Sequence, residues 1–162
     1  MGRFTMAHEV STDEAGFWAL FLDDELSKQV FVGEVGYHRW EVADRSGSGQ
    51  DTKRTVAFDP ARSWPGPVRK LFGSSYGETE KAGFAAPGVW TWARTPSVQS
   101  DKIRMEGALR VEPVAGGRCR AVAEVAVEAR IFGVGGLLES SLEKAFREDQ
   151  NRLVAAYNRR LR

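Results

Sequence analysis

The sequence predicts an α+β fold in which one curved antiparallel sheet wraps around a long C-terminal helix. Two observations support this prediction. Strand-like segments follow one another through most of the chain without long helices between them, which favours antiparallel pairing. The chain then ends in a long amphipathic run, Leu137 to Leu161, whose apolar residues recur at helical spacing. A sheet with one apolar face needs a cover of this length, and the terminal helix can supply it.

Length and composition limit the class of protein. The 162 residues match the usual size of one domain, so we expect a single domain over residues 1–162. Lys and Arg total 23 against 22 Asp and Glu, which argues against a nucleic-acid binder. Cys119 is the single cysteine, and with only His8 and His38 beside it we expect no disulfide, no metal and no cofactor. Without a signal peptide or a membrane-spanning run, a cytoplasmic protein is expected.

The N-terminal segment predicts one strand and two short helices. Phe4 to Val10 is a short mixed run typical of a strand. Ser11 stands three residues before Glu14, the spacing of a capping box, which predicts that Ser11 caps a helix over Thr12 to Leu22. A second short helix follows over residues 23–29.

A hairpin comes next. Val35 to Ala43 and Thr52 to Phe58 are rich in aromatic and β-branched residues, and the flexible turn Ser46 to Gly49 lies between them. Proline and glycine then break the pattern, and Pro67 to Phe72 can form one or two helical turns.

Four further strands bring the total to about seven. Three of them are Tyr76 to Ala85, Val89 to Arg94 and Lys102 to Glu112. The last, Cys119 to Ile131, alternates small apolar residues with charged ones, which is typical of a strand with one wet face. Its small inward side chains leave space beneath the terminal helix, whose apolar stripe is interrupted at residues 149–150.

Three segments are similar to those of a known superfamily. They are Trp64 to Gly73, Val125 to Glu139, and the N-terminal strand that runs into two short helices. In these segments and in element order the chain resembles the START-like superfamily, which has a helix-grip fold and includes the birch-pollen-allergen and polyketide cyclase/dehydrase types. More narrowly, it looks like an uncharacterised bacterial START-like family. The resemblance implies a deep cavity between sheet and helix that takes lipids, sterols or other apolar molecules. Some relatives catalyse cyclisation or dehydration.

The candidate cavity is centred on Trp90, Trp92 and Arg94, which share one face of their strand. If that face points inward, two indoles and a guanidinium can hold an apolar body with an anionic or carbonyl end. The alternative is plain core packing or a surface patch with a salt bridge. The other expected lining residues are Met105, Leu109, Val125 and Val127 from strands, and Phe146, Leu153 and Tyr157 from the helix.

A candidate gate lies in the Pro-bounded segment after the hairpin. Trp64, Leu71 and Phe72, called the gate residues below, could guard the cavity mouth. The neighbouring Arg62, Arg69 and Lys70 add positive charge that could make transient contact with an anionic membrane surface. The competing interpretation is a solvated loop with a hydrophobic anchor.

Other reactive residues favour structural roles. Alternation points Cys119 inward, away from the flanking arginines, as a small core residue. Either histidine could act as a general base with Glu78 or Asp149, but no spacing pairs them.

Three functions therefore remain open. The first is noncatalytic binding or carriage of a small apolar, lipid-like ligand by a monomer or homodimer. The second is a cyclase or dehydratase that uses Arg94 with an acid or a histidine. The third is a ligand-free protein-interaction module. The volume and lining of the space between the last strand and the terminal helix bear on all three.

Overall fold

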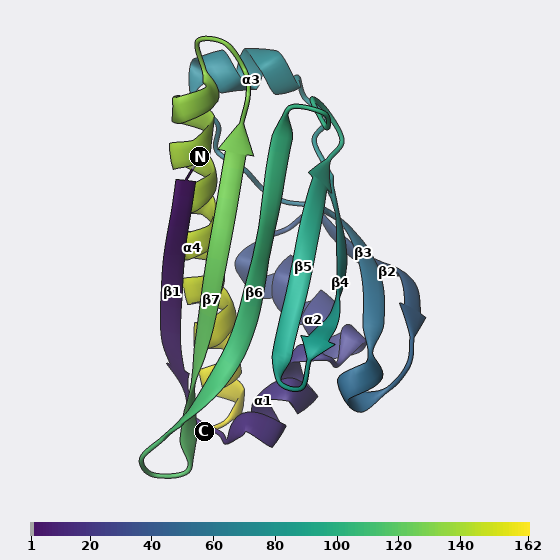
Figure 1. The fold of residues 1–162 in the computed structure, drawn as a ribbon, viewed down its shortest axis with the longest axis vertical. Coiled ribbons are helices and arrows are strands. Elements are labelled where there is room, and N and C mark those ends of the chain that lie inside the picture. The colour runs from purple at the N-terminus through teal and green to yellow at the C-terminus, as the bar shows by residue number, and fades with distance from the viewer. Residues whose placement is uncertain (1) are drawn as a thin grey trace.

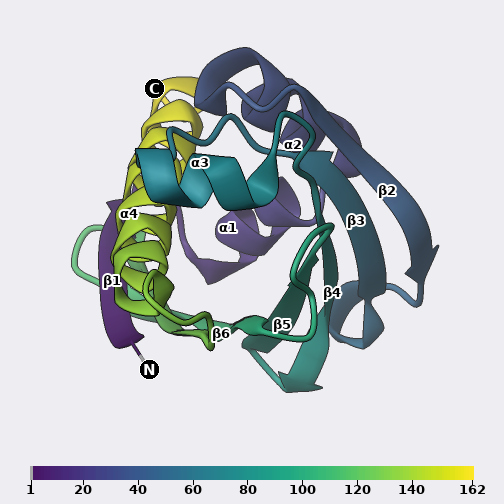
Figure 2. The ribbon, with the colours of Figure 1, turned by 90° about the horizontal axis from the view of Figure 1, so that it is seen from above.

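The computed structural model describes residues 2–162 and confirms the predicted α+β helix-grip architecture. Seven antiparallel strands form one curved sheet in the order β1-β7-β6-β5-β4-β3-β2 (Figure 1). The long helix α4 packs against β1 and β7, while α1 and α2 lie within the curve of the sheet (Figure 2). Within the described residues, no helix is both long and apolar enough to cross a membrane.

The elements follow the expected order. Their bounds are β1 Gly2–Val10, α1 Glu14–Phe21, α2 Asp24–Val30, a π-helical turn Phe31–Val35, β2 Arg39–Ser46, a 3₁₀ turn Gly49–Asp51, β3 Lys53–Asp59, α3 Gly66–Phe72, β4 Glu78–Ala86, β5 Val89–Pro96, β6 Ile103–Val114, β7 Arg118–Ala129 and α4 Gly135–Arg160.

The strand register arranges the inward side chains in rows across the sheet. Residues directly opposite one another in antiparallel strands share a face, so each row can be followed from strand to strand. One row consists of Val56, Glu80, Arg94, Met105 and Val127. The next consists of Arg54, Ala82, Trp92, Gly107, Val125 and Phe4, and the one after it of Phe84, Trp90, Leu109, Ala123 and Met6. Charged residues therefore occupy inward positions in the first two rows.

The first helix begins later than the sequence predicted. The prediction that Ser11 caps it is wrong, because Asp13 is the N-cap and accepts a hydrogen bond from the Gly16 amide at 2.9 Å. A carboxylate at the N-cap satisfies an amide that the helix itself leaves free. Glu14 does not close a capping box but accepts a hydrogen bond from the Trp18 indole at 3.0 Å.

The segment before β2 also differs from the prediction. Residues 35–38 were assigned to a strand, but Phe31–Val35 form a π-helical turn and β2 begins at Arg39. Gly36 ends the turn with φ 98°, a backbone conformation that glycine adopts without strain. Val35 and Tyr37 are buried there, so their apolar character reflects core packing rather than strand pairing.

Candidate functional site

Trp90, Trp92 and Arg94 point inward from β5, toward α4. Trp90 is fully buried. The Trp92 ring stacks on Phe146 of α4 at 5.4 Å between centroids. The Arg94 guanidinium lies 4.7 Å from the Phe146 ring centroid and 4.9 Å from that of Phe58, in the range of a cation–π contact. This strand face therefore meets the helix.

The interior encloses a small cavity of about 80 Å³. It is lined by aromatic, aliphatic and polar residues from the sheet, from α1 and α4, and from the segment between α2 and β2: Met6, Phe21, Phe31, Tyr37, Trp40, Arg54, Phe58, Glu80, Trp90, Trp92, Arg94, Leu109, Ala123, Phe146, Gln150 and Leu153. Drug-sized ligands commonly occupy about 300–1,000 Å³, so the volume here suits a single aromatic ring.

Six of the ten expected lining residues reach this cavity and four do not. Trp90, Trp92, Arg94, Leu109, Phe146 and Leu153 line it. Met105, Val125, Val127 and Tyr157 are buried in the surrounding core instead. Of the small inward residues of β7, Ala123 lines the cavity. Tyr157 is covered by Phe17 of α1, and their ring centroids are 6.1 Å apart.

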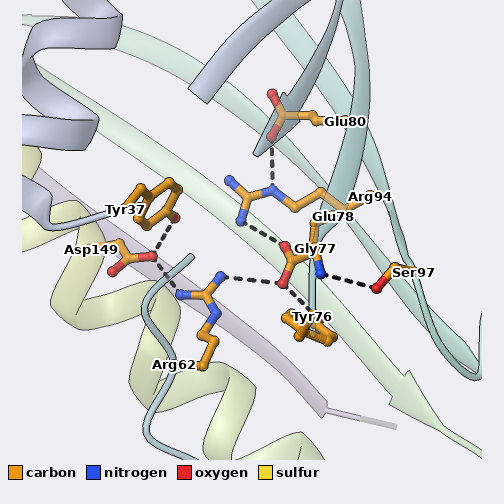
Figure 3. Close-up of polar contacts among 9 residues, drawn as sticks. All are labelled: Tyr37, Arg62, Tyr76, Gly77, Glu78, Glu80, Arg94, Ser97 and Asp149. Atoms are coloured by element: carbon orange, nitrogen blue, oxygen red, sulfur yellow. Dashed lines mark hydrogen bonds and ion pairs between the residues drawn. The ribbon is translucent and has the colours of Figure 1, made fainter. Parts of the chain in front are cut away.

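A buried polar network lies at one end of the cavity, between the sheet and the middle of α4 (Figure 3). Asp149 accepts hydrogen bonds from the Tyr37 hydroxyl at 2.6 Å and from Nη1 of Arg62 at 2.7 Å. Arg62 lies on the loop between β3 and α3, and only 3% of its side chain is exposed. Asp149, which interrupts the apolar stripe of α4, is therefore part of a buried ion pair.

Glu78 extends the network across the sheet. Its carboxylate is fully buried and accepts a hydrogen bond from the Tyr76 hydroxyl at 2.7 Å. Arg62 and Arg94 approach it at 3.5 and 3.6 Å. Arg94 also donates from Nε to Glu80 at 2.8 Å. Because β4 alternates, Glu78 and Glu80 point to the same inward face, where two arginines meet three carboxylates.

The charges of this network stabilise one another. Burial alone would lower the pKa values of Arg62 and Arg94, but the acidic groups around them outweigh burial and raise both above their ordinary range. Burial raises the pKa values of Tyr37 and Tyr76, and the nearby carboxylates raise them further. Both phenols therefore stay neutral donors, and both guanidinium groups stay charged.

A third buried arginine, Arg54, lies further along the cavity. Arg54 of β3 donates to Asp24 at 2.8 Å and to the Phe21 carbonyl at 3.2 Å. Its guanidinium also lies 5.3 to 5.6 Å from the ring centroids of Phe21, Trp40 and Trp90. Arg54 was not among the predicted site residues, although it stands two residues before the buried Val56 and therefore shares the inward face of β3.

The gate residues belong to α3 or to the segment just before it, and α3 lies at one end of the molecule (Figure 1). The Trp64 ring meets those of Phe72 and Tyr76 at 5.0 and 5.3 Å. Phe72 is buried and Leu71 is partly buried. Since Tyr76 also donates to Glu78, this aromatic group sits directly on the polar network.

The remaining candidates are occupied elsewhere. His8 binds the Asn151 side chain at 2.6 Å, and His38 is exposed. The acids proposed as their partners, Glu78 and Asp149, belong to the arginine network instead. Cys119 is fully buried, and burial followed by nearby acidic groups raises the pKa of its thiol. Cys119 and both histidines therefore lie outside the lining of the cavity.

Solved structures share this fold. The Zhui aromatase/cyclase from Streptomyces sp. R1128 superposes with a TM-score of 0.70 at 14% identity, over 99% of this chain and 96% of that one. A START superfamily protein from Mycobacterium smegmatis gives a TM-score of 0.65 at 10% identity, over 99% of each chain. Identities this low establish the fold alone. No curated protein matches the sequence.

A family match covers most of the chain. The family described as "Protein of unknown function (DUF2505)" matches residues 5–154, which span every strand and most of α4. This match includes the residues of the cavity and of the polar network. The chain therefore belongs to the DUF2505 family and has the fold of the START and aromatase/cyclase proteins.

Proposed function

We propose that this protein binds or carries a small, largely apolar ligand in the cavity between the sheet and α4, without transforming it. The observation that carries the proposal is the enclosed volume of about 80 Å³, walled mainly by aromatic rings yet bordered by buried charged side chains. Interiors are normally packed without such voids, and a cavity next to buried donors gives both apolar contact and orientation.

The size of the cavity indicates how a larger ligand would enter. A lipid-like molecule exceeds about 80 Å³, so the Trp92–Phe146 stack would have to separate to admit it. We propose that the gate residues Trp64, Leu71 and Phe72 move with α3 during this opening. Hydrogen exchange in residues 66–72 should then slow on ligand binding, whereas the amides of β7 should keep their protection.

An enzyme of the cyclase or dehydratase kind is a second candidate, favoured by one observation. Arg94 and Glu80 both line the cavity, 2.8 Å apart, so an acid and a cation face any bound molecule. We prefer binding to catalysis because Arg94 and Glu80 are already hydrogen-bonded to each other, so neither is free to act on a substrate. Product formation by the purified protein from an aromatic carbonyl substrate, lost in Glu80→Gln, would favour the enzyme.

Membrane contact could deliver an apolar ligand. Phe132 is fully exposed and Leu137 is 42% exposed. They belong to the connection from β7 to α4 and to the first turn of α4, and this connection lies at the same end of the molecule as α3 (Figure 1). Arg69 and Lys70 of α3 are exposed there as well. We propose transient docking of this end on anionic lipid. Phe132→Ala should then reduce co-sedimentation with phosphatidylglycerol vesicles, while phosphatidylcholine vesicles should bind neither form.

The test of the binding proposal is direct. Protein purified under native conditions should carry an extra mass in native mass spectrometry, and organic extraction should release it. Ala123→Leu fills the cavity from β7 and should abolish the extra mass. Ala93→Leu, on the exposed face of β5, is the matched control and should keep it. Equal ligand content in both variants would overturn the proposed site.

A further inference from the structure

Three cavity-lining residues have a buried N–H donor without a hydrogen-bond acceptor in the described part of the chain: Trp90 at Nε1, Arg54 at Nε and Arg94 at Nη1. Nη1 of Arg94 still faces a carboxylate, that of Glu78 at 3.6 Å, which leaves Trp90 and Arg54 as the two donors to explain. Trp90 is 0% exposed and Arg54 is 5% exposed, and both residues line the cavity. Buried N–H groups in native proteins are nearly always hydrogen-bonded, because an unpaired one loses its hydrogen bond to water and gains none in the protein.

The side chains of Arg54 and Trp90 are in contact. The Arg54 guanidinium is 5.5 Å from the Trp90 ring centroid, and the two residues occupy adjacent inward rows of the sheet. The other nitrogens of Arg54 are engaged by Asp24 and by the Phe21 carbonyl, which hold the guanidinium in place. An acceptor atom in the cavity next to Trp90 would therefore meet a preorganised pair of donors.

Charge distinguishes this end of the cavity from the other. Asp24 is shared by Arg54 and Arg45, at 2.8 and 2.7 Å, so two guanidinium groups face one carboxylate. At the Arg94 end, three carboxylates face two guanidinium groups, and Arg94 is already bound to Glu80. An electron-rich oxygen is attracted to the Arg54 end and repelled from the Arg94 end.

We propose that Arg54 and Trp90 form a donor subsite that binds a carbonyl or carboxylate oxygen of an aromatic ligand. The subsite rests on the proposed function, since it needs the cavity to be a binding site, and it fixes both the ligand class and its orientation. The aromatic body lies toward Trp92 and Phe146, and the oxygen points toward α1 and α2. Arg94, which the sequence made the oxygen-binding residue, serves the buried network instead.

The test uses a matched pair of single-ring probes, toluene and benzaldehyde, which differ by one acceptor oxygen. Isothermal titration should show benzaldehyde binding about five-fold or more tightly than toluene, the advantage expected of one added hydrogen bond. Trp90→Phe keeps an aromatic ring but removes the donor, so it should abolish this preference. Trp92→Phe removes the other lining indole and should leave the preference intact.

A second measurement does not depend on a variant. In a ¹H–¹⁵N spectrum of the unaltered protein, the Trp90 indole N–H should shift downfield with benzaldehyde and much less with toluene. Binding of both probes without preference, or a preference that survives Trp90→Phe, would overturn the subsite while leaving the binding function standing. Failure of both probes to bind would overturn the subsite and the proposed function together.

Discussion

Nη1 of Arg62 lies 2.7 Å from Oδ2 of Asp149, and so ties the loop before α3 to the middle of α4. The two residues are 87 positions apart in the chain. Because Arg62 also approaches Glu78 on β4, a single side chain links loop, helix and sheet. Arg62 therefore contributes both to the stability of the fold and to the closure of the cavity.

Replacing Arg62 with Ala should destabilise the protein strongly. The change leaves Glu78 and Asp149 buried without their shared cation, a situation that typically costs about 3–5 kcal/mol. The free energy of unfolding from urea denaturation measures the effect. Arg39→Ala breaks the exposed pair with Asp59 and should cost about 1 kcal/mol or less. Similar losses in the two variants would contradict the structural role of the buried pair.

Phe146→Ala should open the cavity. The ring contacts Trp92, Arg94 and Phe4, so its removal should cost about 3–5 kcal/mol in unfolding free energy. The same variant should bind two-ring probes such as naphthalene more tightly than the unaltered protein, because it does not have to separate the Trp92–Phe146 stack first. Phe132→Ala, at a fully exposed phenylalanine, should change stability by no more than about 0.5 kcal/mol and should leave naphthalene binding unchanged.

Gly107 makes room for the Trp92 indole. A Cβ atom at this position would lie 2.4 Å from Cζ2 of Trp92 and 2.8 Å from the Glu124 carbonyl oxygen. Gly107→Ala should therefore displace the indole and cost about 1–3 kcal/mol, with a change in tryptophan fluorescence. Gly136→Ala, in the first turn of α4 with open space around it, should be neutral or stabilising by up to about 1 kcal/mol. Equal stability of the two variants would show that Trp92 does not need this space.

Stability should fall steeply at alkaline pH. Burial raises the pKa values of all three tyrosines, Tyr37, Tyr76 and Tyr157, above the ordinary 10.0. The unfolded chain ionises near pH 10.0 while the folded protein stays neutral, so stability is full below that pH and falls as pH rises above it. Each tyrosine contributes about 1.4 kcal/mol per pH unit, and Tyr157→Phe should make the slope shallower by that amount. Tyrosinate absorbance appearing near pH 10 without unfolding would contradict this.

The architecture could be predicted because it depends on local patterns. The alternation of β7 and the length of α4 are visible in the residue order, and neighbouring strands pair in sequence. Trp90, Trp92 and Arg94 were correctly placed on one strand face by the same alternation. The helix start at Ser11 was wrong because Asp13 is an equally good cap and stands two residues later.

The polar network could not be assembled from sequence, because its members come from five separate segments. Arg62 was grouped with the candidate gate, and Asp149 was noted as a break in an apolar stripe and as a possible acidic partner for a histidine. Which acid meets which arginine depends on how the loop before α3 folds back over the sheet. The size of the cavity could not be predicted from the sequence either, because it depends on how far α1 inserts Phe17 and Phe21 into the interior.

The pairing of the first strand with the last one shapes how the chain folds. Gly2 of β1 is opposite Val127 of β7, so β1 finds its partner only after the strands between them have been made. Contacts between such distant segments slow folding, because a long loop must close before they form. On the ribosome, Phe4 and Met6 must wait for β7 and α4 to emerge. The core around β1 is thus completed by elements that are synthesised long after it.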